Sequence, residues 1–159
     1  MHEPLHSFSL SRDEDGVTRQ MSRSGYSDDG EGNVYLYRQA VERSIRGARG
    51  QAFLRKLRDA LDAMPVHRLI TDDIKDETGE VCALGAVDPN ATGYDADDLA
   101  PHFGIAPALA AEIVYRNDEW YGDMQYCRSQ MDETPEERWT RMRAWVDSII
   151  SGAREDRTP

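Results

Sequence analysis

The chain has 159 residues and a formal net charge of −11, with 31% charged and 39% hydrophobic residues. This length suits one domain that buries a core without disulfides or a metal, and no stretch approaches the ~20 apolar residues of a membrane-spanning helix. The strong negative charge also argues against bulk attraction to nucleic acid.

The start of the chain and its cysteines indicate the compartment. The first ten residues contain no basic region followed by an apolar run, so we expect no secretory signal. The two cysteines, Cys82 and Cys127, have no spacing typical of a metal site or of a disulfide-rich secreted scaffold. These features predict a cytoplasmic protein with no membrane contact, no metal and no cofactor.

The first third of the chain changes from irregular to helical. Residues 1–32 are rich in Ser, Asp, Gly and Arg and lack apolar periodicity, so we expect an irregular N-terminal segment. A first helix is predicted over 33–49, where five apolar side chains share one face. These side chains are Val34, Tyr37, Val41, Ile45 and Ala48. Gly50 is predicted to end this helix, and a second helix over 51–64 stops before Pro65.

The centre of the chain is predicted to hold short elements. Residues 68–70 can form a strand, so we expect at most one small β-hairpin near 66–83. The apolar run VCALGAV at 81–87 favours a short buried helix, because Ala and Leu prefer helix to strand. Two further helices are predicted over 99–103 and 107–116.

The last helix has the clearest predicted boundaries. Residues 117–132 before it are aromatic and polar and are expected to be irregular. Thr134 is the predicted N-cap, and Gly152 is predicted to end the helix, which leaves 153–159 as a flexible tail. The pattern predicts a mainly α fold with a single helical domain over 33–152, in which the early and late helices share one core.

Charge is distributed unevenly along the chain. Residues 38–58 hold seven Lys and Arg against one acid, a surplus of six positive charges, while the rest holds 12 basic and 29 acidic residues. Arg46, Arg49 and Arg55 are therefore the basic candidates for binding an acidic partner or a nucleic-acid backbone. The competing interpretation is that these arginines pair with the protein's own acids.

Residues 99–113 have the spacing of a helix-turn-helix. The outward positions early in its second helix would be Pro107, Ala108, Ala111 and Glu112. None of these side chains can donate a hydrogen bond to a base edge or neutralise a phosphate. We therefore expect a structural helical corner and no direct DNA binding.

Residues 88–93 mimic the first half of a calcium loop. Leu99 occupies the position that needs a bidentate Glu, so turn chemistry explains the same residues better. Asp95, Asp97 and Asp98 lie nearby but out of register. They are weak candidates for binding a partner through charge.

Cys82 lies in the apolar run, which favours a buried, inert thiol. A thiol nucleophile would need a base and an orienting group. His67 and the pair Asn117–Asp118 can supply these groups only if the fold brings them together. A small thiol-dependent enzyme is therefore an alternative function.

Five segments carry a resemblance to a known family. They read SGYSDD, RGARGQAFLRKLRDALDAMP, GEVCALGAV, FGIAPALAAEIVYRNDE and TPEERWTRMRAWV. Over about residues 21–147 the chain resembles a family of small uncharacterised proteins of phages and prophages of proteobacteria. The resemblance implies a phage accessory role in a bacterial cytoplasm and brings no catalytic residue. It draws attention to Cys82, Gly85, Asn117 and Asp118, since the CALGA helix is expected to pack near the Asn–Asp turn.

These observations favour a non-enzymatic, phage-type accessory protein that binds a host or phage protein, with inhibition by its acidic surface as one mode of action. The acidic remainder of the chain is the expected contact, so the partner would present a basic cleft of the kind that handles nucleic acid. The alternatives are the thiol enzyme around Cys82 and a nucleic-acid-associated module that uses the basic segment 38–58.

Overall fold

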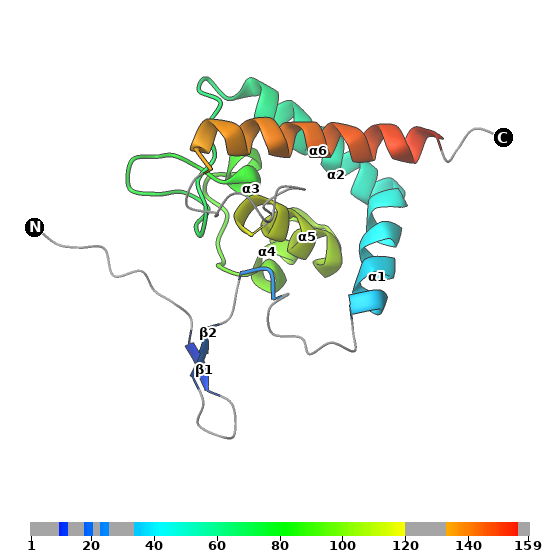
Figure 1. The fold of residues 1–159 in the computed structure, drawn as a ribbon, viewed down its shortest axis with the longest axis horizontal. Helices are drawn as coiled ribbons and strands as arrows, with labels where there is room; N and C mark the ends of the chain where they lie inside the picture. Colours follow the sequence, from blue (N-terminus) through cyan, green and yellow to red (C-terminus); the bar gives the residue numbers. More distant parts are fainter. Residues whose placement is uncertain (1–9, 13–17, 21–22, 26–33, 120–132, 156–159) are drawn as a thin grey trace, which may run out of the picture.

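The computed structural model describes residues 10–12, 18–20, 23–25, 34–119 and 133–155. In this described part, six helices surround one hydrophobic core, and two strands pair away from it (Figure 1). The strands are β1 (Leu10–Arg12) and β2 (Thr18–Gln20), and the helices are α1 (Val34–Arg46), α2 (Ala48–Ala63), α3 (Ala83–Val87), α4 (Ala96–Phe103), α5 (Pro107–Asp118) and α6 (Pro135–Glu155). The predicted mainly α, single-domain fold is confirmed.

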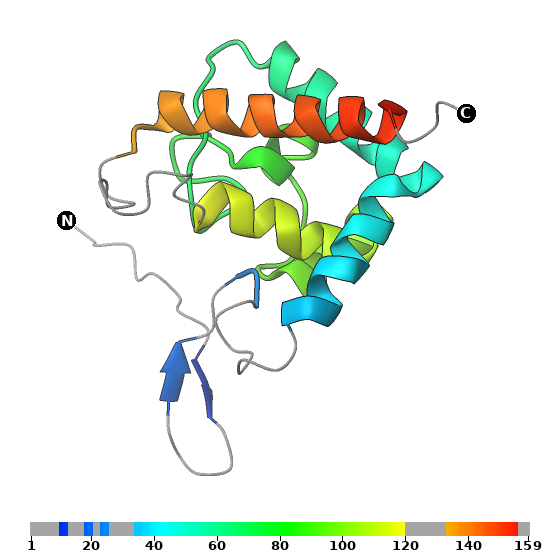
Figure 2. The same ribbon diagram turned by 45° about the vertical axis from the view of Figure 1, so that its right-hand side comes forward.

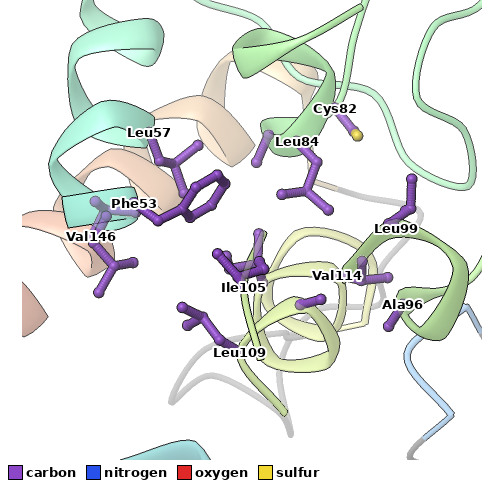
Figure 3. Close-up of a cluster of buried hydrophobic side chains, with 14 of the residues drawn as sticks. Phe53, Leu57, Cys82, Leu84, Ala96, Leu99, Ile105, Leu109, Val114 and Val146 are labelled. Atoms are coloured by element: carbon purple, nitrogen blue, oxygen red, sulfur yellow. The ribbon is translucent and has the colours of Figure 1, made fainter. Parts of the chain in front are cut away.

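Helix α5 lies at the centre of the helical body. It contacts α1, α3, α4 and α6, and apolar side chains on several of its sides are buried. They are Leu109, Ala110, Ala111, Ile113 and Val114. A helix that is apolar on most of its circumference needs neighbours on most sides, and Figure 3 shows Leu109 and Val114 among side chains from the surrounding helices.

Helices α2 and α6 pack against each other on one side of α5 (Figures 1 and 2). The buried stripe of α2 includes Leu54, Leu57 and Leu61, and α6 contributes Met142 and Val146 to the same core. The predicted sharing of one core by the early and late helices is therefore confirmed.

The chain bends between α1 and α2 at Gly47, three residues before the predicted position. Gly47 is the N-cap of α2, whereas Gly50 lies inside that helix and is buried. A Cβ atom at Gly50 would overlap the carbonyl oxygen of Ser44. Gln51 fixes the same approach, because its Nε2 donates a hydrogen bond to the Ile45 carbonyl at 2.7 Å. The prediction that Gly50 ends the first helix is wrong, because this glycine permits close packing of two helices.

The paired strands lie in the segment that was predicted to be irregular. Strands β1 and β2 run antiparallel, with Leu10 opposite Gln20, and project from the helical body (Figure 2). Near 66–83, where at most one small hairpin was expected, the described chain has one isolated antiparallel bridge between Lys75 and Val81. Three-residue strands carry too little periodicity to be recognised in a sequence.

Helix α6 begins as predicted and ends later. The Thr134 hydroxyl accepts a hydrogen bond from the Glu137 amide at 3.1 Å, but the helix continues through Gly152 to Glu155. A glycine in a helix interior costs only ~1 kcal/mol, so the predicted helix end at Gly152 is wrong, while the flexibility predicted for the tail stays a prediction. Although α6 has 21 residues, no described helix is both long and apolar enough to cross a membrane.

Candidate functional site

Four polar side chains gather in the core at the carboxyl end of α5. We call Arg23, Cys82, Asn117 and Asp118 the Asp118 cluster; their exposed fractions lie between 2% and 4%. Asn117 and Asp118 form the last turn of α5, although they were predicted to begin an irregular segment. Residues 120–132 of that segment, which include Cys127, lie outside the described chain.

Asn117 joins α5 to α3. Its Oδ1 accepts a hydrogen bond from the Ala83 amide at 3.1 Å, and its Nδ2 donates to the Ile70 carbonyl at 2.8 Å. The first amides of a helix have no partner within that helix, so Asn117 satisfies a donor that would otherwise be buried without an acceptor. The expected packing of the CALGA helix against the Asn–Asp pair is confirmed.

Cys82 forms the N-cap of α3. Its Sγ accepts a hydrogen bond from the Gly85 amide at 3.4 Å, and a Cβ at Gly85 would overlap the Ile74 carbonyl oxygen. Burial raises the pKa of the Cys82 thiol, which suppresses the reactive thiolate. No histidine of the described chain hydrogen-bonds to this thiol; His67 stacks on Trp139 with 3.7 Å between ring centroids. The burial of Cys82 is confirmed, and this geometry disfavours a thiol nucleophile.

Arg23 brings a positive charge into the cluster. Its Nη1 donates to Asp118 Oδ2 at 2.9 Å, and its Nε donates to the Tyr94 carbonyl at 2.9 Å. The guanidinium carbon also lies 5.5 Å from the centroid of the Tyr94 ring. Burial raises the pKa of the Asp118 carboxyl, and the charge of Arg23 opposes that rise. Arg23 thus helps to stabilise a buried Asp118 carboxylate, and the Asn117 side-chain amide does so too by donating to Asp118 Oδ1 at 2.7 Å.

The main chain around Arg23 is bound as well. The Ala96 amide donates to the Arg23 carbonyl at 2.9 Å, and the Ser24 hydroxyl donates to Glu119 Oε2 at 2.6 Å. We call Tyr94, Ala96, Asp118 and Glu119 together the Arg23 site. These four residues hold Arg23 and Ser24 against the helical body.

Sequence reasoning missed Arg23. The residue lies 95 positions before Asp118, in a segment rich in charged and small residues. A single arginine there has no local pattern that marks a buried partner. The nearest signal was the SGYSDD motif of the resemblance, which begins one residue later.

The predicted basic candidates lie on the surface. Arg46, Arg49 and Arg55 are exposed. Within the described chain, no side-chain hydrogen bond or ion pair involves Arg38, Arg43, Arg49, Arg55 or Lys56, while Arg58 lies 3.5 Å from its neighbour Asp59. Pairing with the protein's own acids therefore does not account for most of this segment's charge.

The predicted acidic candidates serve the start of α4. Asp95 is the N-cap, and its Oδ1 accepts a hydrogen bond from the Asp98 amide at 2.9 Å. Asp97 and Asp98 are exposed in the first turn, where negative charge interacts favourably with the helix dipole. The structure does not bring these acids together with the basic candidates in any hydrogen bond or ion pair of the described residues.

The calcium-like segment also has a structural explanation. Asp88 Oδ1 accepts a hydrogen bond from the Asn90 amide at 2.9 Å, and its Oδ2 lies 2.7 Å from His102 Nε2. In the described part of the chain, no group of three or more His, Cys, Asp or Glu side chains could hold a metal ion. These contacts connect the loop before α4 to the end of that helix.

The helix-turn-helix spacing corresponds to the corner between α4 and α5. Gly104 makes the turn with φ of +65°, and the Ile105 amide donates to the Ala100 carbonyl at 3.1 Å. The second helix of this corner is the central helix α5, and Ala111, one of its predicted outward residues, is buried. The expected structural corner is observed.

Comparisons with known proteins add no relative. The chain matches no protein-family model, and no curated protein or solved structure matches it significantly. The resemblance to phage and prophage proteins therefore remains a prediction.

Proposed function

We propose that this chain is a non-enzymatic, phage-type accessory protein that binds a host or phage protein through its acidic surface. The observation that carries the proposal is the burial of Cys82. A thiol hydrolase needs an accessible sulfur with a base within hydrogen-bond reach, whereas this sulfur caps a helix inside the core. The candidate nucleophile Cys82 thereby has a structural role, which directs attention to the surface.

An acidic loop supports the choice of surface. Residues 71–80 contain five acids and one lysine and connect α2 to α3 on the side away from α1 (Figure 1). The loop has a fixed shape, because Asp76 Oδ1 accepts hydrogen bonds from the amides of Thr78 and Glu80 at 2.9 and 3.0 Å, and Ile74 is buried beneath it. Fixed charges lose little entropy on binding and attract a basic surface on a partner.

Affinity capture tests this proposal. The immobilised chain should capture a protein from proteobacterial cells with or without phage infection at ~150 mM salt, and added DNA or RNA should compete for that protein. A variant with Glu77→Gln, Asp97→Asn and Asp98→Asn should capture less, whereas Arg55→Gln should capture as much as the unsubstituted chain. Equal capture by both variants would reject the acidic surface as the contact.

A second function, association with nucleic acid through segment 38–58, is favoured by exposed cations of α1 and α2 whose side chains form no hydrogen bond or ion pair within the described chain, such as Arg49 and Arg55. Long-range repulsion from the acidic remainder opposes it. Direct binding of DNA and RNA at ~150 mM salt distinguishes the two functions. Micromolar binding that is lost in Arg46→Glu/Arg49→Glu would reject the acidic-contact proposal.

A further inference from the structure

The pair Arg23–Ser24 is held as a peptide ligand is held. Four hydrogen bonds bind it to groups that lie 71 to 95 residues away in the sequence. In Figures 1 and 2 the short segment 23–25 lies against the helical body near α4 and α5, whereas β1 and β2 project away from it. Hydrogen bonds of two side chains and one main-chain amide thus anchor this segment. Residues 23–25 themselves belong to no strand or helix.

The Arg23 site has the chemistry of an arginine receptor. Asp118 and the Tyr94 carbonyl accept from two different nitrogens of the guanidinium, and the Tyr94 ring adds a cation–π contact. The Ala96 amide binds the main chain of the arginine, and Glu119 binds the hydroxyl of the next residue. The site therefore binds three groups: the arginine side chain, the main-chain carbonyl of the same residue and the hydroxyl of the residue that follows it.

We infer that the Arg23 site is a recognition site for an arginine-bearing peptide segment, that the chain fills it with its own Arg23–Ser24, and that a basic segment of a partner protein takes the same place. The inference rests on the proposed function, since the partner is a protein with a basic surface. It goes further by naming the groups that receive the partner's arginine.

Charge and burial select this occupant. Asp118 is 4% exposed, and a buried carboxylate that loses its cation is strongly destabilised. An emptied site therefore favours a new cation over a neutral or acidic segment. The planar guanidinium presents several donors in a fixed fork, while an ammonium is a strongly hydrated point charge, so arginine is preferred to lysine.

The chain's own segment competes with any partner. A tethered ligand acts at an effective concentration in the millimolar range when its linker is short. The site is consequently closed to weak basic peptides, and a partner must displace Arg23 to enter. Replacement of Arg23 and Ser24 by Ala removes the side-chain part of this competition without substituting any receptor residue, while the main-chain carbonyl of residue 23 stays.

Fluorescence anisotropy of a labelled peptide tests the inference. The probe is the capped heptapeptide Met-Ser-Arg-Ser-Gly-Tyr-Ser, which has the sequence of residues 21–27. It should bind the full chain carrying Arg23→Ala/Ser24→Ala at least about tenfold more tightly than the unsubstituted chain, because the internal competitor has lost its guanidinium and its hydroxyl. Replacement of the peptide's arginine by alanine, or addition of Asp118→Asn to the variant, should abolish binding. As a matched control, Arg55→Ala should bind the probe as weakly as the unsubstituted chain does.

Three results would overturn the inference: no saturable binding to the double variant, equal binding to the unsubstituted chain, or binding that ignores the peptide's arginine. If the double variant does not fold alone, the heptapeptide added during refolding should restore a cooperative unfolding transition. Failure of that rescue overturns the inference too. Partner capture by the unsubstituted chain without peptide binding would reject this site alone, whereas peptide binding without partner capture would reject the proposed function.

Discussion

The arginines of α6 and those of α1 and α2 lie in different surroundings. On α6, Arg138 and Arg141 lie 3.2 and 2.7 Å from oxygens of Glu133, and Arg143 lies 2.7 Å from an oxygen of Asp62. On α1 and α2, the exposed cations without a partner in the described chain are Arg38, Arg43, Arg49, Arg55 and Lys56.

The polar groups near α5 and α6 also differ from those on α1 and α2 in what they contact. Near the junction of α5 and α6, polar groups such as Asn117 and Arg138 reach backbone carbonyls and hold segments together. On the outer faces of α1 and α2, charge contributes little to internal structure. Polar residues in the first region should therefore control stability, while those in the second are free to serve recognition.

The largest expected effect concerns the thiol of Cys82. In a Cys127→Ser background at neutral pH, a thiol reagent should label native Cys82 about a thousandfold more slowly than the unfolded chain, because access requires an opening of ~4 kcal/mol. The raised pKa of the thiol slows the reaction further. The measurement is the labelling rate with and without denaturant. Equal rates would contradict the burial and revive the thiol enzyme.

Substitution of Asn117 tests the hydrogen bonds of the first region. Asn117→Ala should lower the free energy of unfolding by about 2–4 kcal/mol, because it leaves the Ala83 amide and the Ile70 carbonyl without this partner. Urea denaturation measures the change. Glu112→Gln, on the half-buried side of the same helix, is the control and should have a smaller effect.

Gly50 distinguishes the inner face of the α1–α2 pair from its outer face. Gly50→Ala should cost about 1–3 kcal/mol or more, because the added Cβ overlaps the Ser44 carbonyl. Gly47→Ala is the matched control, since its Cβ would lie at an ordinary 3.5 Å from the Arg43 carbonyl. Thermal unfolding of both variants checks the prediction. A larger loss of stability in Gly47→Ala than in Gly50→Ala would contradict the close contact of the two helices at Gly50.

The contact between Asp62 and Arg143 should make stability depend on acid pH. The hydrogen bond from Arg143 lowers the pKa of Asp62 in the folded chain, so its contribution is present above the unfolded pKa and is lost as the pH falls through the folded value. Melting temperatures between neutral and strongly acidic pH should fall less steeply for Asp62→Asn than for the unsubstituted chain. Parallel curves would show that this pair does not contribute.

The smallest effect is expected on the outer faces of α1 and α2. Arg49→Gln and Arg55→Gln should each change the free energy of unfolding by less than about 0.5 kcal/mol, because neither side chain pairs with a described residue. Arg138→Gln is the comparison and should destabilise the protein clearly, since its Nη1 donates to the buried Leu69 carbonyl at 2.8 Å. Similar losses for all three variants would remove the contrast between the regions.

The helices could be predicted from the sequence because burial of one face imposes an apolar period on neighbouring residues. Their ends could not be placed as well. Gly50 and Gly152 look like helix terminators, yet one permits helix packing and the other lies within α6. Asn117 and Asp118 interrupt the apolar pattern of α5, so the pattern did not show that they continue the helix.

The candidate site was less predictable than the fold. The contact of Cys82 with the helix that follows it is local, and its sequence neighbours indicated burial. The proximity of α3 to Asn117 came from the resemblance alone. The pairing of Arg23 with Asp118 depends on the completed tertiary fold, since no periodic pattern connects residues so far apart.

The separation of Arg23 from Asp118 also sets an order of events during synthesis. Asp118 follows Arg23 by 95 residues, and translation adds about 5–20 residues per second. Arg23 is therefore incorporated into the chain about 5–20 s before its carboxylate partner. Throughout that interval Arg23 has no carboxylate partner of its own in the growing chain, so the segment that carries it cannot yet be anchored to the helical body.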